Sequence, residues 1–118
     1  MSMHELAVTK SIIRVVVSEC RRRNVKTPKK VIIELGNLTA YKKEPVLFYF
    51  DMLKTEERML SETVLEVNEM PGKIRCNKCK KESGVNEAYL MMCPECESTD
   101  VEIIQGKDFI IASIETGD

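Results

Sequence analysis

The sequence predicts an α+β fold in which two helices pack on a small three-stranded β-sheet and a second, four-cysteine domain is inserted before the last strand. Three observations lead to this prediction. Two segments carry apolar residues at helical spacing, three carry alternating apolar residues, and two Cys-x-x-Cys pairs lie between the second and third of the alternating segments. We therefore expect one α+β domain made of residues 1–70 and 107–118, and an inserted domain of residues 71–106.

The first predicted helix covers residues 5–23. Arg21, Arg22 and Arg23 fall in its last turn, where cations suit the negative end of the helix dipole. Asn24 can end the helix in the left-handed conformation. One face of this helix carries a stripe of mostly apolar residues that we expect to be buried, with Cys20 as a buried thiol. The stripe consists of Leu6, Thr9, Ile13, Val16, Val17 and Cys20.

The three strands of the first domain follow from alternation. Residues 29–38 place every second side chain on one face and end at Gly36-Asn37. Residues 63–70 and 109–115 show the same period. Because the last of these segments follows the cysteine-containing region, we expect it to return to the first sheet.

The second predicted helix begins at Glu44-Pro45, where the missing N–H of proline costs nothing in the first turn. It continues to Leu53 and is apolar on almost all sides. Such a helix is either buried or contacts a partner or a second copy of the chain.

The four cysteines Cys76, Cys79, Cys93 and Cys96 form two chelating pairs separated by thirteen residues. Four thiolates surround one ion tetrahedrally, which is the arrangement that structural zinc prefers, and they leave no open position for a substrate. Short strands around Ile74 and at residues 89–92 and 101–105 would make a zinc ribbon, which folds only with its metal. Each Cys-x-x-Cys pair is expected to lie in a tight turn, called a zinc knuckle. Glu97 follows the second pair where many knuckles have glycine, so we expect a slightly different turn there.

Other functions of the cysteine domain have weaker support. A redox Cys-x-x-Cys needs a strand-to-helix context that neither pair shows. A nucleic-acid ribbon needs a basic face with aromatic residues, whereas this one is mostly acidic. A zinc-ribbon adaptor that binds nucleic acid through Arg21–Arg23, or a protein complex, stays as the alternative, beside a purely structural interaction domain. No enzyme is expected, because the chain has one histidine and no pattern of an activated nucleophile.

The composition limits where the protein works. No run of about 18 apolar residues occurs, so we expect no membrane span. The chain start lacks the features of a secretory signal. Five cysteines without such a signal favour metal binding in a reducing, cytoplasmic compartment. A net charge of −1 argues against a nucleic-acid partner.

The single histidine, His4, lies beside the chain start. By itself it could be a solvated residue before a helix. An N-terminal amine, an imidazole and deprotonated backbone amides also give nickel or copper the planar nitrogen set that these ions favour.

Several motifs together resemble the HypA family of nickel-delivery proteins. Met3-His4-Glu5-Leu6 is similar to the family's Met-His-Glu start, and Leu35-Gly36-Asn37-Leu38-Thr39 to its Ile-Gly-x-Leu-Ser. The stretch from Glu44-Pro45 to Asp51, the paired Cys-x-x-Cys motifs and the closing Gly106 to Glu115 segment occur in the family's order.

The resemblance implies a nickel metallochaperone of [NiFe]-hydrogenase maturation. His4 would be the key Ni(II) ligand, with Glu5 supplying backbone, and the four cysteines would hold structural Zn(II). The implied partners are a GTPase co-chaperone of the HypB type and the hydrogenase large subunit. Whether a urease is also a client is left open.

One departure concerns the chain start. In the family, histidine follows the initiator methionine, whereas here two residues precede Met3. If Met1 is removed before Ser2, histidine becomes third, a position that lets the amine, two amides and the imidazole surround Ni²⁺ in one plane.

Overall fold

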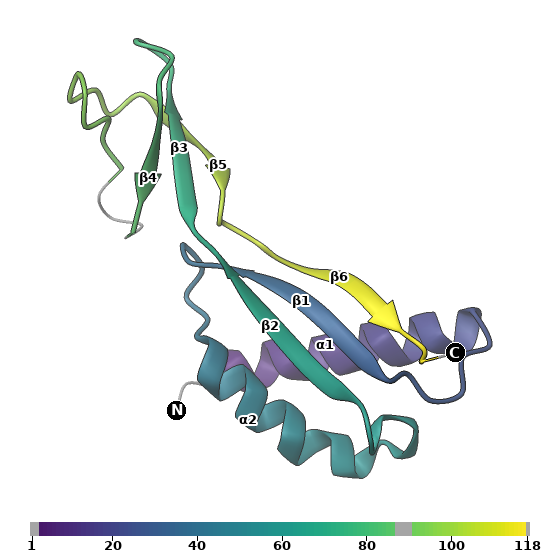
Figure 1. The fold of residues 1–118 in the computed structure, drawn as a ribbon. Helices are drawn as coiled ribbons and strands as arrows, with labels where there is room; N and C mark the ends of the chain where they lie inside the picture. The colour runs from purple at the N-terminus through teal and green to yellow at the C-terminus, as the bar shows by residue number, and fades with distance from the viewer. Residues whose placement is uncertain (1–2, 87–90, 118) are drawn as a thin grey trace. The chain divides into compact units, whose positions relative to one another are not determined.

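The computed structural model describes residues 3–86 and 91–117 (Figure 1). The elements in chain order are α1 (Met3–Arg22), β1 (Lys30–Gly36), α2 (Lys43–Leu53), the 3₁₀ turns η1 (Lys54–Glu56) and η2 (Arg58–Leu60), β2 (Val64–Met70), β3 (Gly72–Cys76), β4 (Glu82–Val85), β5 (Val101–Gln105) and β6 (Phe109–Glu115). The strands form two three-stranded sheets, ordered β2-β1-β6 and β4-β3-β5. The predicted α+β class is confirmed, and β6 returns to the first sheet as expected.

The chain divides into two compact units. The first comprises Met1–Glu34, Tyr41–Asn68 and Ile110–Asp118, and the second comprises Leu35–Ala40 and Glu69–Phe109. The predicted domain boundaries at residues 70 and 107 stay a prediction.

The first unit is a two-layer structure in which α1 and α2 cover one face of the sheet (Figure 1). Lys29 joins the strands at one end, because its N–H donates to the carbonyl of Glu115 at 2.7 Å and its carbonyl accepts from the N–H of Val64 at 3.1 Å. The core consists of side chains at most 7% exposed: Val8, Ile12, Val16, Val17, Cys20, Val31, Ile33, Val46, Phe50, Leu60, Leu65 and Val67. Most of the predicted stripe of α1 is therefore buried, although Leu6 and Ile13 are only half-buried.

The end of α1 is set by Asn24, which has φ of 58°. The N–H of Val25 donates to the carbonyl of Cys20 at 2.8 Å, and the N–H of Asn24 donates to the carbonyl of Arg21 at 3.3 Å. These two bonds form a Schellman motif, so the predicted left-handed end is confirmed.

The second helix, α2, is buried on one side only. Val46 and Phe50 lie in the core, whereas Phe48 and Met52 are 51% and 46% exposed. The helix therefore combines a core face with an exposed apolar face.

The second unit contains the β4-β3-β5 sheet, in which β3 pairs antiparallel with both neighbours. The prediction of a strand at residues 89–92 is wrong in its described part, since Met91 and Met92 are not in a strand, and residues 89–90 lie outside the described ranges. The third strand of this sheet is instead Glu82–Val85. This segment directly follows the first cysteine pair, so the chain turns back and pairs Glu82 with Arg75 of β3.

In the second unit, the backbone at Gly36 passes very close to the backbone at Gly106. We call this close approach the glycine crossing. The N–H of Gly36 donates to the carbonyl of Asp108 and the N–H of Leu38 to that of Gly106, both at 2.9 Å. A Cβ on Gly36 would lie 2.1 Å from the carbonyl oxygen of Gly106. Gly106 itself has φ of +92°, a conformation that favours glycine. Only glycine allows the two backbones to approach this closely.

Candidate metal centres

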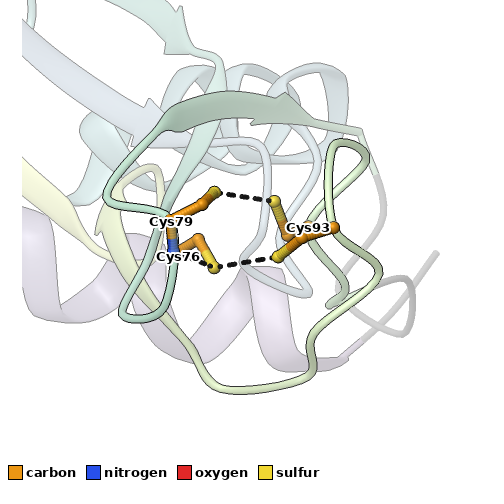
Figure 2. Close-up of side chains that lie close together, drawn as sticks. Cys76, Cys79 and Cys93 are labelled. Atoms are coloured by element: carbon orange, nitrogen blue, oxygen red, sulfur yellow. Dashed lines mark hydrogen bonds between the residues drawn. The ribbon is translucent and has the colours of Figure 1, made fainter.

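The four cysteine sulfurs form one compact cluster. Their Sγ atoms all lie within 4.8 Å of one another. Across the two pairs, Cys76 Sγ lies 3.6 Å from Cys96 Sγ, and Cys79 Sγ lies 3.6 Å from Cys93 Sγ (Figure 2). A tetrahedral zinc ion with Zn–S bonds of about 2.3 Å places its sulfurs about 3.8 Å apart. The two separations across the pairs are close to this value, so the group suits a zinc ion.

The two knuckles that carry the sulfurs have the same backbone hydrogen bonds. In the first, Lys80 N–H donates to the Cys76 carbonyl at 2.9 Å, and Cys76 N–H donates to the Lys81 carbonyl at 2.9 Å. In the second, Glu97 and Ser98 make the equivalent bonds with Cys93, at 2.8 and 2.9 Å.

Both knuckles turn through a left-handed residue. Lys80 has φ of 66° and Glu97 has φ of 62°. The expectation of a different turn at Glu97 is wrong, because this residue adopts the conformation that glycine would supply. The hydrogen bonds of the knuckle and the position of Cys96 outweigh the steric cost.

Backbone N–H groups prepare two of the thiols for a cation. The N–H groups of Cys79 and Lys78 lie 3.4 Å from Cys76 Sγ and lower the pKa of this thiol to about 6. The N–H groups of Cys96 and Glu95 likewise lower the pKa of Cys93. Thiolates bind zinc, so both shifts act in the direction that favours metal binding.

The other two thiols favour their protonated form. The N–H of Ser98 lowers the pKa of Cys96, but the sulfur of Cys76 and desolvation outweigh this effect and raise it to about 11. The pKa of Cys79 is raised for similar reasons, against the effect of the Lys81 N–H. The raised pKa values oppose further negative charge beside the first two sulfurs, and a bound cation would compensate that charge.

Polar contacts beyond the sulfurs join the two knuckles. Asn77 donates to Asp100 through both its backbone and its side chain, each at 3.0 Å. Lys81 Nζ lies 3.7 Å from Glu95 Oε2, so an exposed ion pair also joins the two knuckles. Cys76 and Cys93 are buried and Cys96 is exposed, so a bound ion would be covered by protein on one side.

The predicted nickel residues His4 and Glu5 lie in the first turn of α1 and differ in burial. His4 is exposed, whereas Glu5 is only 2% exposed. Glu5 Oε2 accepts a hydrogen bond from the backbone N–H of Lys42 at 3.0 Å, and its carbonyl accepts from Thr9 Oγ1 at 2.6 Å. Within residues 3–86 and 91–117, the cysteine group is the one set of three or more potential ligands, so the nickel site stays a prediction.

The role of Glu5 as an internal anchor was not apparent from the sequence. Its partner is 37 positions away, and a carboxylate in a first helical turn is ordinarily exposed. The sequence contains one indication of this contact. Residue 42, which precedes the second helix, is a lysine and cannot cap that helix with its own side chain, so an acceptor has to come from elsewhere.

No helix in the described part of the chain is long and apolar enough to cross a membrane.

Comparisons with known proteins agree with the motifs. The family model described as "Hydrogenase/urease nickel incorporation, metallochaperone, hypA" matches residues 3–116. A hydrogenase maturation factor HypA from Moorella thermoacetica is 38% identical over 109 residues, covering 92% of this chain and 95% of that protein. A HypA from Caldanaerobacter subterraneus is 36% identical over 116 residues, covering 96% and 98%.

Solved structures share the fold. The solution structure of the nickel metallochaperone HypA from Helicobacter pylori aligns with a TM-score of 0.70 at 20% identity, covering 95% of this chain and 96% of that one. A second HypA solution structure aligns with a TM-score of 0.72 at 22% identity and 98% coverage of both chains. The chain therefore belongs to the HypA family of hydrogenase/urease nickel incorporation metallochaperones, whose members carry metal and are not enzymes.

Proposed function

We propose that this protein binds Ni(II) through His4 and the neighbouring N-terminal backbone and delivers it to the large subunit of a [NiFe]-hydrogenase, while Cys76, Cys79, Cys93 and Cys96 hold a structural Zn(II). Family membership supports the delivery of nickel, and the spacing of the four sulfurs supports zinc. The observation that carries the nickel site is the contrast between an exposed His4 and a buried, anchored Glu5.

This contrast suits a carrier site. The imidazole of His4 is accessible to solvent, and the next residue is held in place through its carboxylate. Glu5 would supply its backbone nitrogen from this fixed position, with its side chain tuning the orientation of the turn. Planar coordination by nitrogen atoms favours Ni²⁺ and Cu²⁺, whereas zinc has no preference for that plane.

An exposed nickel site also suits transfer. A partner can reach the ion and replace the protein ligands one at a time, which a closed site would prevent. The cysteine site has the opposite character, because four thiolates complete the zinc shell and leave no position for exchange.

The zinc would act through folding. Residues 71–106 are too few to bury a sufficient core, so metal binding supplies much of the free energy of their folding, on the order of 10 kcal/mol. We propose that this segment folds as a unit around zinc, separately from residues 1–70 and 107–118.

The proposed partners follow from the family. They are a GTPase co-chaperone of the HypB type and the hydrogenase large subunit, in the cytoplasm. A urease is a second proposed client, because the family description names both hydrogenase and urease. Family membership favours this function over a zinc-ribbon adaptor for nucleic acid.

Calorimetric titration of Ni²⁺ into the zinc-loaded protein tests the nickel site. Three forms are compared: the chain that starts at Met1, a chain that starts at Met3, and His4→Ala. We expect stoichiometric binding in the first two and its loss in His4→Ala, together with the absorption of planar nickel. Because the amides must lose protons, the affinity should fall as the pH is lowered.

The other outcomes are equally informative. Binding only by the chain that starts at Met3 would show that the two preceding residues block the site. Binding that is equal in His4→Ala and the unchanged protein would exclude His4 as the ligand and overturn the proposed site.

A further inference from the structure

A groove runs along α1 in the first unit and extends toward the end of α2. Its main part has a volume of about 480 Å³ and is lined by residues of α1 together with Glu57. A smaller hollow of about 150 Å³ shares Lys10, Ile13 and Glu57 with it and adds Leu53 and Glu56. The two hollows form one feature, which we call the α1 groove.

One rim of the α1 groove is basic. Lys10, Arg14 and Arg21 are exposed and recur at four and seven residues, which places them along one side of the helix. Among the described residues, none of the three lies in an ion pair. Arg22 and Arg23, by contrast, are paired with Glu19 at 2.8 and 3.1 Å. The rim cations are therefore available to an external anion.

The floor and the opposite rim have different chemistry. Ile13, Val17 and Leu53 give the floor an apolar surface. Glu56 and Glu57 form the opposite rim, and neither makes an ion pair within the described part of the chain. The groove thus presents an apolar strip between a row of cations and a pair of carboxylates.

We propose that the α1 groove docks an amphipathic helix of a partner protein, with an apolar stripe flanked by acidic residues on one side and basic residues on the other. An apolar strip between charged rims is the surface that such a helix recognises through residues spaced by three and four. The charges of opposite sign on the two rims fix the orientation of the docked helix and reject helices with the wrong flanks.

A nucleic acid fits this groove less well. Glu56 and Glu57 would repel phosphates, and no aromatic side chain lines either hollow to stack on a base. The inference is also independent of the nickel site, since none of the lining residues is a proposed metal ligand.

The test uses the zinc-loaded full chain and synthetic helical peptides of about 18 residues, or five turns. The main probe has a leucine stripe with glutamates on one flank and lysines on the other. One control peptide has lysines on both flanks, and a second has serines in place of the leucines. Binding is followed through the methyl resonances of Ile13 and Val17.

We expect saturable shifts of both methyl groups with the mixed-charge peptide and weaker binding of both controls. Lys10→Glu should weaken binding by about fivefold, the size expected for a partly exposed charge pair. Lys26→Glu is the matched control, because it makes the same change of charge at an exposed loop residue outside the groove.

Four results would overturn the proposal: no shift at Ile13 and Val17, equal weakening by Lys10→Glu and Lys26→Glu, a preference for the all-lysine peptide, or tighter binding of a single-stranded oligonucleotide at the same rim. Shifts of these methyl groups with protein concentration alone would assign the groove to a second copy of the chain instead.

Discussion

Glu5 and Lys42 connect the beginnings of the two helices: Oε2 of Glu5, in the first turn of α1, accepts a 3.0 Å hydrogen bond from the backbone N–H of Lys42, the residue before α2. Lys42 has no side-chain cap of its own. The carboxylate of Glu5 satisfies an N–H at the positive end of α2, as a capping side chain would. The residue next to the proposed nickel ligand is therefore part of the helix packing.

Replacing Glu5 should destabilise the first unit. Glu5→Ala leaves the Lys42 N–H without its buried acceptor and should lower the free energy of unfolding by about 2 kcal/mol, whereas Glu5→Gln keeps an acceptor and should cost about half as much. Urea unfolding of the zinc-loaded protein, followed by helical circular dichroism, measures both. Glu44→Ala, at an exposed residue in the first turn of α2, is the control, and an equal effect there would contradict the anchoring role.

Removing zinc should unfold the second unit before the first. In Cys96→Ser, or after chelation, the resonances of β3 and β5 should lose their dispersion while those of α1 persist, because the sulfurs lie in the knuckles beside these strands. Cys20→Ala is the control, since Cys20 is buried in α1 and should leave one zinc bound. Two-dimensional NMR and metal analysis of both variants provide the measurement, and a Cys96→Ser protein with a dispersed ribbon spectrum would show that zinc is not required.

Zinc binding at pH 7 should release close to four protons. The metal-free ribbon is expected to be unfolded, so its four thiols have the ordinary pKa of 9.0 and are protonated at this pH. A ribbon that was folded before zinc binds would release fewer protons, because the folded knuckle lowers the pKa of Cys76 to about 6 and this thiol would then be mostly thiolate. The zinc affinity should fall as the pH is lowered, since protons compete with the metal for the thiolates. Calorimetry in buffers of different ionisation enthalpy counts the protons, and a release of clearly fewer than four at pH 7 would show that the ribbon is folded without zinc.

The left-handed knuckle residues should accept glycine with a gain in stability. Glu97→Gly relieves the steric cost of φ at 62°, and after the loss of chain entropy the net gain should be about 0.5 kcal/mol. The same holds for Lys80→Gly. Competition with a zinc chelator and thermal unfolding of the ribbon report the change. Glu97→Ala removes the same charge but keeps the strain, so an equal gain from alanine would attribute the effect to charge.

Gly36 should not tolerate a side chain. A methyl group there would meet the backbone oxygen of Gly106 at 2.1 Å, which cannot move without breaking the crossing, so Gly36→Ala should cost about 3 kcal/mol or more. Gly84→Ala is the matched control, because its Cβ would come no nearer than 4.0 Å to any other part of the chain. Denaturant unfolding measures the free energy of unfolding of both variants. Similar values for the two variants would show that the glycine crossing is not tightly constrained.

The sequence predicted most of the fold because most elements are determined locally. Each of the signals determines the structure of only a few neighbouring residues. They are the apolar stripe of α1, Asn24 at the end of that helix, and Pro45 at the start of α2. The spacing of the cysteines likewise predicted the cluster, since a Cys-x-x-Cys pair brings its own two sulfurs together.

The features that sequence patterns could not predict depend on distant or purely backbone interactions. The strand Glu82–Val85 has the sequence Glu-Ser-Gly-Val, which lacks an apolar alternation, and it forms because the knuckle directs it along β3. The bond between Glu5 and Lys42 joins residues 37 positions apart. Neither leaves a periodic signal in the chain.

The two knuckles have matching hydrogen bonds, so the backbone conformation of the cysteine site does not depend on the charge of the side chains beside it. Lys80 and Glu97 occupy equivalent places with opposite charges, yet the backbone around each turns alike. Substitutions at these two positions can therefore change the electric field at the sulfurs, and with it the ease of metal loss, while every ligand stays where it is. Under the proposed function, in which the protein keeps zinc and gives up nickel, the retention of zinc can be adjusted in evolution without redesigning the fold.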